Sequence, residues 1–199
     1  MKRIIIFDFD GVIVNSCNMS YRINLSDLPD LEYSEWQSWF DNNVFKSIRK
    51  ELQNDEYQEH FFNEYGSKIC DIKPVDGIDN IIAKISSNNK LVIVSSSSHK
   101  AIESYLITYN LRDFFDEILA REVHESKVEK FKKIKDMYRV GFDDCLIITD
   151  TLGDIMEASE VGMRSIGVTW GAHNREKLSL GSPLAIVDKP EEIISIIYP

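Results

Sequence analysis

The sequence contains only three cysteines among its 199 residues, and none of them belongs to a CxxC pair. Cys17, Cys70 and Cys145 are widely spaced and odd in number, which is not typical of a disulfide framework or a zinc site. We therefore expect reduced thiols in a cytoplasmic protein. The sequence also has no long apolar run, because the run that begins at Ile4 ends at Asp8. That length is too short for a signal peptide or a membrane span, so no membrane partner is expected.

Basic residues are also scarce, and they form no strongly basic block. The chain has 23 lysines and arginines against 33 aspartates and glutamates, which gives a formal net charge of −10. Nucleic acid is a poor match for such a protein. A phosphorylated ligand would have to be bound locally, by individual lysines, a metal ion and backbone N–H groups. The length fits one domain, with or without a small insert, and the sequence does not indicate an oligomeric state.

From about residue 75 onward, short apolar strands alternate with amphipathic helices. Strands are predicted at 91–94, around 118–119, and at 146–148, 165–168 and 185–187. Helical spacing of apolar side chains is found at 78–85, 101–106, 128–137, 155–161 and 193–197. Strands that are apolar on both faces and separated by helices indicate a parallel sheet covered on both sides. The predicted fold class is therefore α/β, with a doubly wound, Rossmann-like parallel sheet.

Residues 15–74 differ from the rest of the chain because they contain no apolar strand run. We therefore predict a small α-helical insert after the first strand, at 15–74, and an α/β core formed by 1–14 and 75–199. In doubly wound sheets, ligands bind beyond the C-terminal ends of the strands. An insert after the first strand would stand over that end.

Two patterns in the insert have the spacing of a capping box, which opens a helix: Ser34 with Gln37, and Asp55 with Gln58. The insert also holds many aromatic residues, and three of them are interpreted as its own small core, with a binding face as the alternative: Trp36, Trp39 and Phe40. Four of its basic residues are interpreted as surface groups that could also contact a substrate: Arg22, Lys46, Arg49 and His60.

Two carboxylates follow the first apolar strand, in the sequence Phe7-Asp8-Phe9-Asp10-Gly11. Residues i and i+2 of an extended chain point to the same side, so Asp8 and Asp10 should project together. Their mutual repulsion is relieved by a cation or a shared proton, which indicates a Mg²⁺ site or an acid/base pair. An acidic turn at the end of a strand is the simpler alternative.

A run of four serines, at 95–98, follows a predicted strand and precedes a predicted helix. Serine is a favoured N-cap residue, so helix capping alone would explain the run. A hydroxyl and backbone N–H groups at a helix N-terminus can also hold a phosphate. Ser95 and the adjacent Ser96 are the candidates for phosphate binding, and Ser97 or Ser98 is the better candidate for the cap.

Lys127, Asp150 and Asp154 stand where predicted strands give way to helices. A surface lysine, a strand-end carboxylate and a carboxylate favoured by the helix dipole are the simpler alternatives. With Asp8 and Asp10, the two later aspartates would form an oxygen-rich site suited to Mg²⁺. The other lysines of the helix that follows Lys127 are interpreted as its solvated polar face: Lys130, Lys132, Lys133 and Lys135.

Taken in order, these motifs resemble those of the haloacid dehalogenase-like superfamily of phosphatases. They are a DxDGV stretch, a serine after a strand, a lysine, and an Asp-xxx-Asp pair. The stretch at 161–171 is also similar to the phosphoglycolate phosphatase-like branch, whose helical cap resembles the insert. The resemblance covers the whole predicted core, and its most specific part is 7–12.

The resemblance implies a role for each candidate residue. Asp8 would be the nucleophile that forms an aspartyl-phosphate, and Asp10 would protonate the leaving alcohol and then deprotonate the attacking water. Ser95 would hydrogen-bond the phosphoryl oxygens, and Lys127 would neutralise Asp8 and the transferring group.

The same resemblance implies a Mg²⁺ cofactor. Asp150 would bind the ion together with Asp8 and the backbone carbonyl of Asp10. Asp154 would be a further ligand or would orient Lys127. The four aspartates implied in metal binding are therefore Asp8, Asp10, Asp150 and Asp154.

The function that follows is a Mg²⁺-dependent phosphatase acting on a small phosphorylated metabolite. A phosphomutase of the same superfamily would use the same residues. A non-catalytic phospho-acceptor module is a further alternative, although such modules carry their aspartate on a central strand that is not the first in the sequence, and they lack an insert. Asp10 and the insert therefore favour turnover, and the sequence identifies neither the substrate nor the residues that select it.

Overall fold

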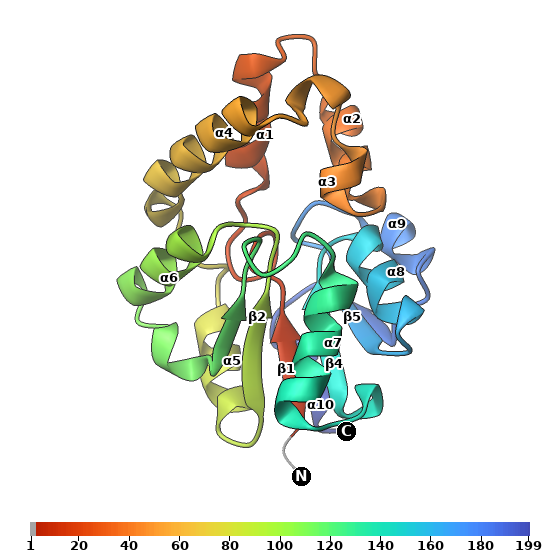
Figure 1. Ribbon diagram of the computed structural model, residues 1–199. Coiled ribbons are helices and arrows are strands. Elements are labelled where there is room, and N and C mark those ends of the chain that lie inside the picture. The colour runs from red at the N-terminus through yellow and green to blue at the C-terminus, as the bar shows by residue number, and fades with distance from the viewer. Residues whose placement is uncertain (1–2) are drawn as a thin grey trace.

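The computed structural model describes residues 3–199 and contains a six-stranded parallel sheet (Figure 1). The strand order is β3-β2-β1-β4-β5-β6, and every neighbouring pair is parallel. The strands are β1 (Ile4–Phe7), β2 (Lys90–Val94), β3 (Glu117–Leu119), β4 (Cys145–Thr149), β5 (Arg164–Val168) and β6 (Ala185–Val187). Residues 1 and 2 of the predicted core lie outside the described residues.

The central strand β1 shows why the sheet is covered on both sides. Ile5 and Phe7 belong to one buried apolar cluster, and Ile4 and Ile6 belong to another. Side chains of the first cluster come from α5 (Ile78–Ser86), α6 (His99–Thr108) and α10 (Glu192–Ile197). Side chains of the second cluster come from α7 (Lys127–Tyr138) and α8 (Leu152–Glu160). The predicted doubly wound α/β fold is confirmed, and the short helix α9 (Arg175–Ser179), which packs beside β5 and β6, was not predicted.

The helices of the insert lie above the carboxyl ends of the strands in the view of Figure 1. They are α1 (Cys17–Asp27), α2 (Tyr33–Ser38), α3 (Val44–Ser47) and α4 (Asp55–Lys68). Short 3₁₀ turns occur at Trp39–Asp41, Lys50–Leu52, Ile69–Asp71, Arg112–Phe114 and Phe142–Asp144. As expected, Trp36 and Trp39 are buried in an apolar cluster of the insert, and Phe40 packs against it. Ala172 of the core joins the same cluster, so this part of the insert is packed onto the sheet domain.

The two connections between the core and the insert lie side by side. Val14, on the way out, forms an antiparallel bridge with Pro74, on the way back. The N–H of Val75 donates a hydrogen bond to the carbonyl of Ile13 at 2.9 Å. The predicted boundaries at 14 and 75 therefore fall in a paired ribbon, although the division into two parts stays a prediction.

The capping box predicted at Ser34 is wrong. Helix α2 begins at Tyr33, so its N-cap is Glu32, two residues before Ser34, and no side chain among the described residues caps it. Tyr33 stacks on Trp36 with 5.3 Å between the ring centroids. Side chains three apart on a helix are neighbours, so the stacking of Tyr33 on the buried Trp36 favours the earlier start.

The capping box predicted at Asp55 is displaced too, by one residue. Asn54 is the N-cap of α4, and its Oδ1 accepts a hydrogen bond from the N–H of Tyr57 at 2.8 Å. Asparagine caps helices as well as aspartate does, so the preceding residue takes the role.

Within residues 3–199, no helix has both the length and the apolar character that a membrane crossing requires.

Candidate active site

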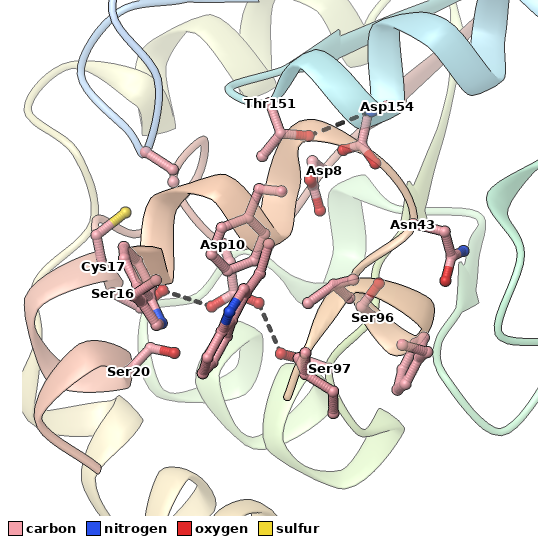
Figure 2. Close-up of a pocket in the computed structure, with 18 of the residues that line it drawn as sticks. Asp8, Asp10, Ser16, Cys17, Ser20, Asn43, Ser96, Ser97, Thr151 and Asp154 are labelled. Carbon is pink, nitrogen blue, oxygen red and sulfur yellow. Dashed lines mark hydrogen bonds between the residues drawn. The ribbon is translucent and has the colours of Figure 1, made fainter. Parts of the chain in front are cut away.

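The carboxyl ends of β1, β2 and β4 meet the first turns of α7 and α8 beneath the insert. A pocket lies at this junction, between the sheet and the insert (Figure 2). Six of the predicted site residues line it: Asp8, Asp10, Ser96, Lys127, Asp150 and Asp154. Stretches that are more than 100 residues apart in the sequence therefore converge on one place.

Lys127 lies between two aspartates in the floor of this pocket. Its Nζ donates to Asp8 Oδ2 at 2.7 Å and to Asp154 Oδ2 at 2.6 Å, and all three side chains are buried. Burial opposes the charge on Lys127, but Asp154 and Asp8 outweigh it and raise the pKa of the lysine above its usual range. Lys127 therefore presents a fixed positive charge beside the Asp8 carboxylate.

The two carboxylates differ in their own electrostatics. Burial would raise the pKa of Asp154, but Lys127 and hydrogen bonds to the charged carboxylate hold it below its usual range. Burial raises the pKa of Asp8, because the attraction of Lys127 does not offset it and Asp154 and Asp150 add to it. Asp154 is thus the firmly ionised partner of the lysine. Asp8 is the carboxylate that an additional positive charge would stabilise most.

Asp154 is held in place by its own helix and strand. Thr151, the N-cap of α8, accepts a hydrogen bond from the N–H of Asp154 at 3.3 Å. Thr149, the last residue of β4, donates its hydroxyl to Asp154 Oδ2 at 2.6 Å. With Lys127 on the same oxygen, these contacts are those of a residue that orients the lysine.

Asp150 has an oxygen without a partner. Its Oδ2 accepts a hydrogen bond from the N–H of Ala172 at 2.7 Å. Its Oδ1 is buried and has no hydrogen-bond partner among residues 3–199. Burial raises the pKa of Asp150 to about 7. A buried carboxylate oxygen with no donor is the environment that a bound cation would complement.

Two glycines make room for the Asp150 carboxylate. A Cβ on Gly11 would lie 1.8 Å from Asp150 Oδ2, and one on Gly171 would lie 2.2 Å from it. Gly11 also has φ +69°, in the left-handed region that glycine adopts without strain. The glycine of the DxDGV stretch is therefore required twice, by the turn after Asp10 and by the close approach of a carboxylate.

Two carboxylates and one backbone carbonyl would form an all-oxygen donor set, which is the kind that the hard ion Mg²⁺ prefers. Asp8 and Asp150 would supply the carboxylates, and Asp10 its backbone carbonyl. In the part of the chain that the structure describes, no three His, Cys, Asp or Glu side chains gather as a metal cluster. The Asp10 side chain, which the sequence predicts as a further ligand, accepts hydrogen bonds from hydroxyls through both of its oxygens, and Asp154 binds Lys127 and Thr149 through Oδ2.

Asp10 is surrounded by three hydroxyl donors. Ser97 donates to its Oδ2 at 2.6 Å, and Ser16 donates to its Oδ1; Figure 2 shows both contacts. Tyr65, near the end of α4, donates to the same Oδ1. Burial and the nearby Asp10 raise the pKa of Tyr65 well above its usual range, so its hydroxyl stays a donor. Sequence reasoning missed Tyr65, and its only signal was the aromatic spacing of four residues from Phe61, on which it stacks.

The serine run divides its roles differently from the prediction. Ser97 contacts Asp10, whereas Ser95 is fully buried and its Oγ accepts a hydrogen bond from the N–H of Ser97 at 3.0 Å. Ser96 lines the pocket, and Ser95 does not line it. Of the two predicted cap candidates, Ser98 is the N-cap of α6 and accepts a backbone N–H of the first turn at 3.4 Å.

The interpretation of Lys130 as a solvated residue is wrong. Its side chain is fully buried, and its Nζ donates to the carbonyl of Ser95 at 2.6 Å. Burial and the charge of Lys127 lower the pKa of Lys130 to about 8. Lys130 follows Lys127 by three residues and so lies on the same side of α7, toward the sheet. Lys132 and Lys133 are exposed, as predicted.

The insert is docked closely on the core at the side of α8. Gly153 lies in the first turn of this helix, and a Cβ there would be 2.4 Å from the carbonyl oxygen of Asn42. Next to this contact, Lys177 Nζ donates to Asp41 Oδ2 at 2.6 Å. On the other side of the pocket, Arg121 Nη2 donates to Gln58 Oε1 of α4 at 2.6 Å. The structure is therefore a closed arrangement, in which the insert covers the floor residues.

A family model described as haloacid dehalogenase-like hydrolase matches residues 5–168, a span that includes Asp8, Lys127 and Asp154. The chain belongs to this family. Among curated proteins, the phosphoglycolate phosphatase of Synechococcus elongatus is 24% identical over 208 aligned positions, covering 97% of this chain and 96% of that protein. Membership of the haloacid dehalogenase-like family makes this protein a hydrolase.

Solved structures of the family have the same fold. A haloacid dehalogenase-like hydrolase from Streptococcus pneumoniae is 20% identical and superimposes with a TM-score of 0.83, covering 98% of each chain. CbbY from Rhodobacter sphaeroides, solved in complex with phosphate, is 16% identical with a TM-score of 0.77, covering 97% of this chain and 96% of that one. The α/β sheet and the helices over its carboxyl end are thus those of the family.

Proposed function

We propose that this protein is a Mg²⁺-dependent phosphatase that hydrolyses a small phosphomonoester through an aspartyl-phosphate on Asp8. The observation that carries the proposal is the buried contact of Lys127 with Asp8 and Asp154, at 2.7 and 2.6 Å. Phosphoryl transfer depends mainly on positioning and on neutralising charge. A carboxylate with a fixed lysine beside it can approach an anionic phosphoryl group.

The first half-reaction transfers the phosphoryl group to the protein. The Asp8 carboxylate attacks phosphorus, and the bond between phosphorus and the leaving oxygen breaks. Asp10 gives its proton to that oxygen, so that a neutral alcohol is released. Lys127 balances the negative charge that Asp8 and the transferring oxygens share.

The second half-reaction restores Asp8. A water molecule gives a proton to Asp10 and attacks phosphorus, and the bond between phosphorus and Asp8 breaks. Inorganic phosphate leaves, and Asp10 is protonated again for the next cycle. The hydroxyls of Ser16, Ser97 and Tyr65 hold Asp10 in position through both steps.

The proposal includes Mg²⁺ held by Asp8, Asp150 and the Asp10 carbonyl, where it would neutralise charge on the phosphoryl oxygens. The partnerless Oδ1 of Asp150 supports this assignment. Ser96 lines the pocket at the loop between β2 and α6. Backbone N–H groups of that loop are suited to the remaining phosphoryl oxygens. Ser95 would act mainly by shaping the loop, since its hydroxyl is turned to Ser97.

The experiment that tests this function follows hydrolysis of 4-nitrophenyl phosphate with Mg²⁺. Sustained release by the wild type is expected, and Asp8→Asn should reduce it by about 10³-fold or more. Asp10→Asn should still accept phosphate on Asp8 but turn over about 10² to 10⁴ times more slowly. Asp188→Asn, an exposed surface change, is the matched control and should leave the rate unchanged.

Three results would contradict the proposal. One phosphate bound per wild-type molecule without turnover would indicate a phospho-acceptor. Conversion of a sugar phosphate to its isomer, without inorganic phosphate, would indicate a phosphomutase. Equal steady-state rates for wild type and Asp10→Asn would remove the acid/base role of Asp10.

A further inference from the structure

The pocket wall that faces the floor carboxylates is largely apolar. Aromatic side chains of the insert dominate it, among them Trp36, Trp39, Phe40, Phe45, Phe61 and Phe62. Phosphate would bind at the floor, where Lys127 and the aspartates lie. The alcohol part of a substrate would therefore sit among these rings.

In the part of the chain that the structure describes, the pocket offers no free cation to a second negative charge. Among the described residues, Lys127 is the only lysine, arginine or histidine that lines it, and its ammonium group is engaged by Asp8 and Asp154. Within residues 3–199, the one further charged group of the lining, besides Lys127 and the aspartates of the floor, is Glu157, which is an acid. A substrate that carried an additional anion would meet negative charge there.

The cations that the sequence offered as substrate contacts lie elsewhere. Arg49 Nε donates to Glu35 Oε1 at 2.6 Å, and His60 lies 3.2 Å from Asp27. The remaining two are exposed and do not line the pocket: Arg22 and Lys46.

Arg121 lies behind the wall and is also engaged. Its guanidinium group is 3.9 Å from the centroid of the Phe62 ring and donates to Gln58 Oε1 at 2.6 Å. Phe62 and Gln58 line the pocket, whereas Arg121 does not. The arginine therefore supports the wall from outside and leaves the surface inside it uncharged.

Asn43 also lines the pocket and adds no charge to it. Its Nδ2 donates to the carbonyl of Glu125 at 3.1 Å and lies 3.5 Å from Glu157 Oε1. Both partners are acceptors, which fixes the amide orientation. The Oδ1 atom is buried and has no hydrogen-bond partner among residues 3–199. Figure 2 shows Asn43 across Asp8 and Asp10 from Cys17. A neutral amide of this kind supplies no counter-ion to an anionic leaving group.

We propose that the leaving group of the substrate is an alcohol with an apolar or aromatic body and no negative charge. This inference rests on the proposed phosphatase function. It excludes substrates such as 2-phosphoglycolate and pyrophosphate, whose leaving groups are anions. Moving an anion from water into an apolar wall without a partner is costly, whereas burial of an apolar body is favourable.

The test compares kcat/KM for esters that differ in one charge, with Mg²⁺ present. Phenyl phosphate should exceed 3-carboxyphenyl phosphate by at least tenfold, and 2-phosphoglycolate and pyrophosphate by more. Equal or higher kcat/KM for any of the three anionic substrates would overturn the inference while leaving the phosphatase function intact. No hydrolysis of phenyl or 4-nitrophenyl phosphate would overturn the phosphatase function, and the inference would fall with it.

A designed cation gives a second, independent measurement. Phe45 lines the wall on α3 and is half-buried, so Phe45→Lys would place an ammonium group beside the leaving group. The ratio of kcat/KM for 3-carboxyphenyl to phenyl phosphate should rise at least tenfold relative to Phe45→Met, the neutral control. The same ratio in both variants would overturn the inference. The wild-type comparison decides the question even if the lysine variant does not fold.

Discussion

Two buried lysines of α7 are in opposite electrostatic situations. Lys127 donates to two carboxylates, whereas Lys130 donates to one backbone carbonyl. The first lysine is stabilised as a cation by its partners. The second carries a charge that burial and Lys127 oppose. The two side chains lie one turn apart, so their difference comes from their partners rather than from depth.

Replacing Lys127 by methionine is expected to destabilise the protein by about 3 kcal/mol. The variant keeps the bulk of the side chain but leaves Asp8 and Asp154 buried without a counter-ion. Urea unfolding at pH 7 measures the change. Lys132→Met is the control on the same helix, because Lys132 is half-exposed and pairs only with Glu129; it should cost less than about 0.5 kcal/mol. Equal effects of the two changes would show that the buried cluster is not balanced by Lys127.

Lys130 predicts a pH dependence of stability. Its pKa is about 8 in the folded protein against 10.5 ordinarily, so between these values the unfolded chain holds a proton that the folded one has released. The free energy of unfolding of the wild type should therefore rise with pH from 8 to 10.5, relative to Lys130→Met. Urea unfolding of both proteins across this range gives the difference, in which other titrating groups cancel. A difference that stays constant with pH would contradict the assignment.

At the residue scale, the sequence predicts the members of the site that follow strands. Asp8, Asp150 and Lys127 could be placed because the ends of parallel strands share one edge of the sheet. Tyr65 could not be placed, since its contact with Asp10 spans 55 positions and depends on how α4 is docked. Lys130 was misread because a lysine run suggests a solvated face, although its spacing from Lys127 places it toward the sheet.

At the scale of elements, helix α4 brings one hydroxyl from the insert into the floor of the pocket. Tyr65→Phe should lower kcat for phenyl phosphate about tenfold, because Asp10 loses one of three hydroxyls that hold it. The loss should be smaller for 4-nitrophenyl phosphate, whose leaving group needs less help from an acid. Tyr109→Phe, which removes a hydroxyl bonded to the Cys70 carbonyl away from the pocket, is the control. Equal losses with both substrates would point to a purely structural role.

Elements differed in how well the sequence predicted them. The central strands β1, β2 and β4 could be placed because each holds an apolar run that is buried on both faces. The starts of α2 and α4 could not, since neighbouring residues such as Asn54 and Asp55 cap equally well. Helix α9 was missed because its five residues are too few to show a helical period.

At the scale of the whole molecule, docking of the insert depends on a glycine in α8. Gly153→Ala should destabilise the protein and lower kcat/KM, because a Cβ would collide with the Asn42 carbonyl. In a helix without such a collision, the same change stabilises by up to about 1 kcal/mol. Gly66→Ala in α4 is the control, since nothing lies within 4 Å of its Cβ position. Urea unfolding gives the sign of each change in the free energy of unfolding. Stabilisation by both substitutions would show that the insert moves away from the added Cβ without a loss of stability.

The overall architecture was predictable, and the relation between its parts was not. Alternation of apolar strands with amphipathic helices is a local pattern, and it determines the doubly wound sheet. The closed position of the insert depends on contacts such as Lys177 with Asp41, between residues that no pattern relates. The wall of the pocket depends on contacts of this kind, and the choice of substrate depends on the wall.

The bridge between Val14 and Pro74 has a consequence for how such proteins diversify. The segment from 15 to 74 leaves and rejoins the sheet at neighbouring points, so a foreign segment of another length could be grafted there without stretching the scaffold. The grafted chain would inherit the same carboxylates and lysine beneath it. New specificities could thus be acquired by exchanging one contiguous stretch, while the chemistry below is transmitted unaltered.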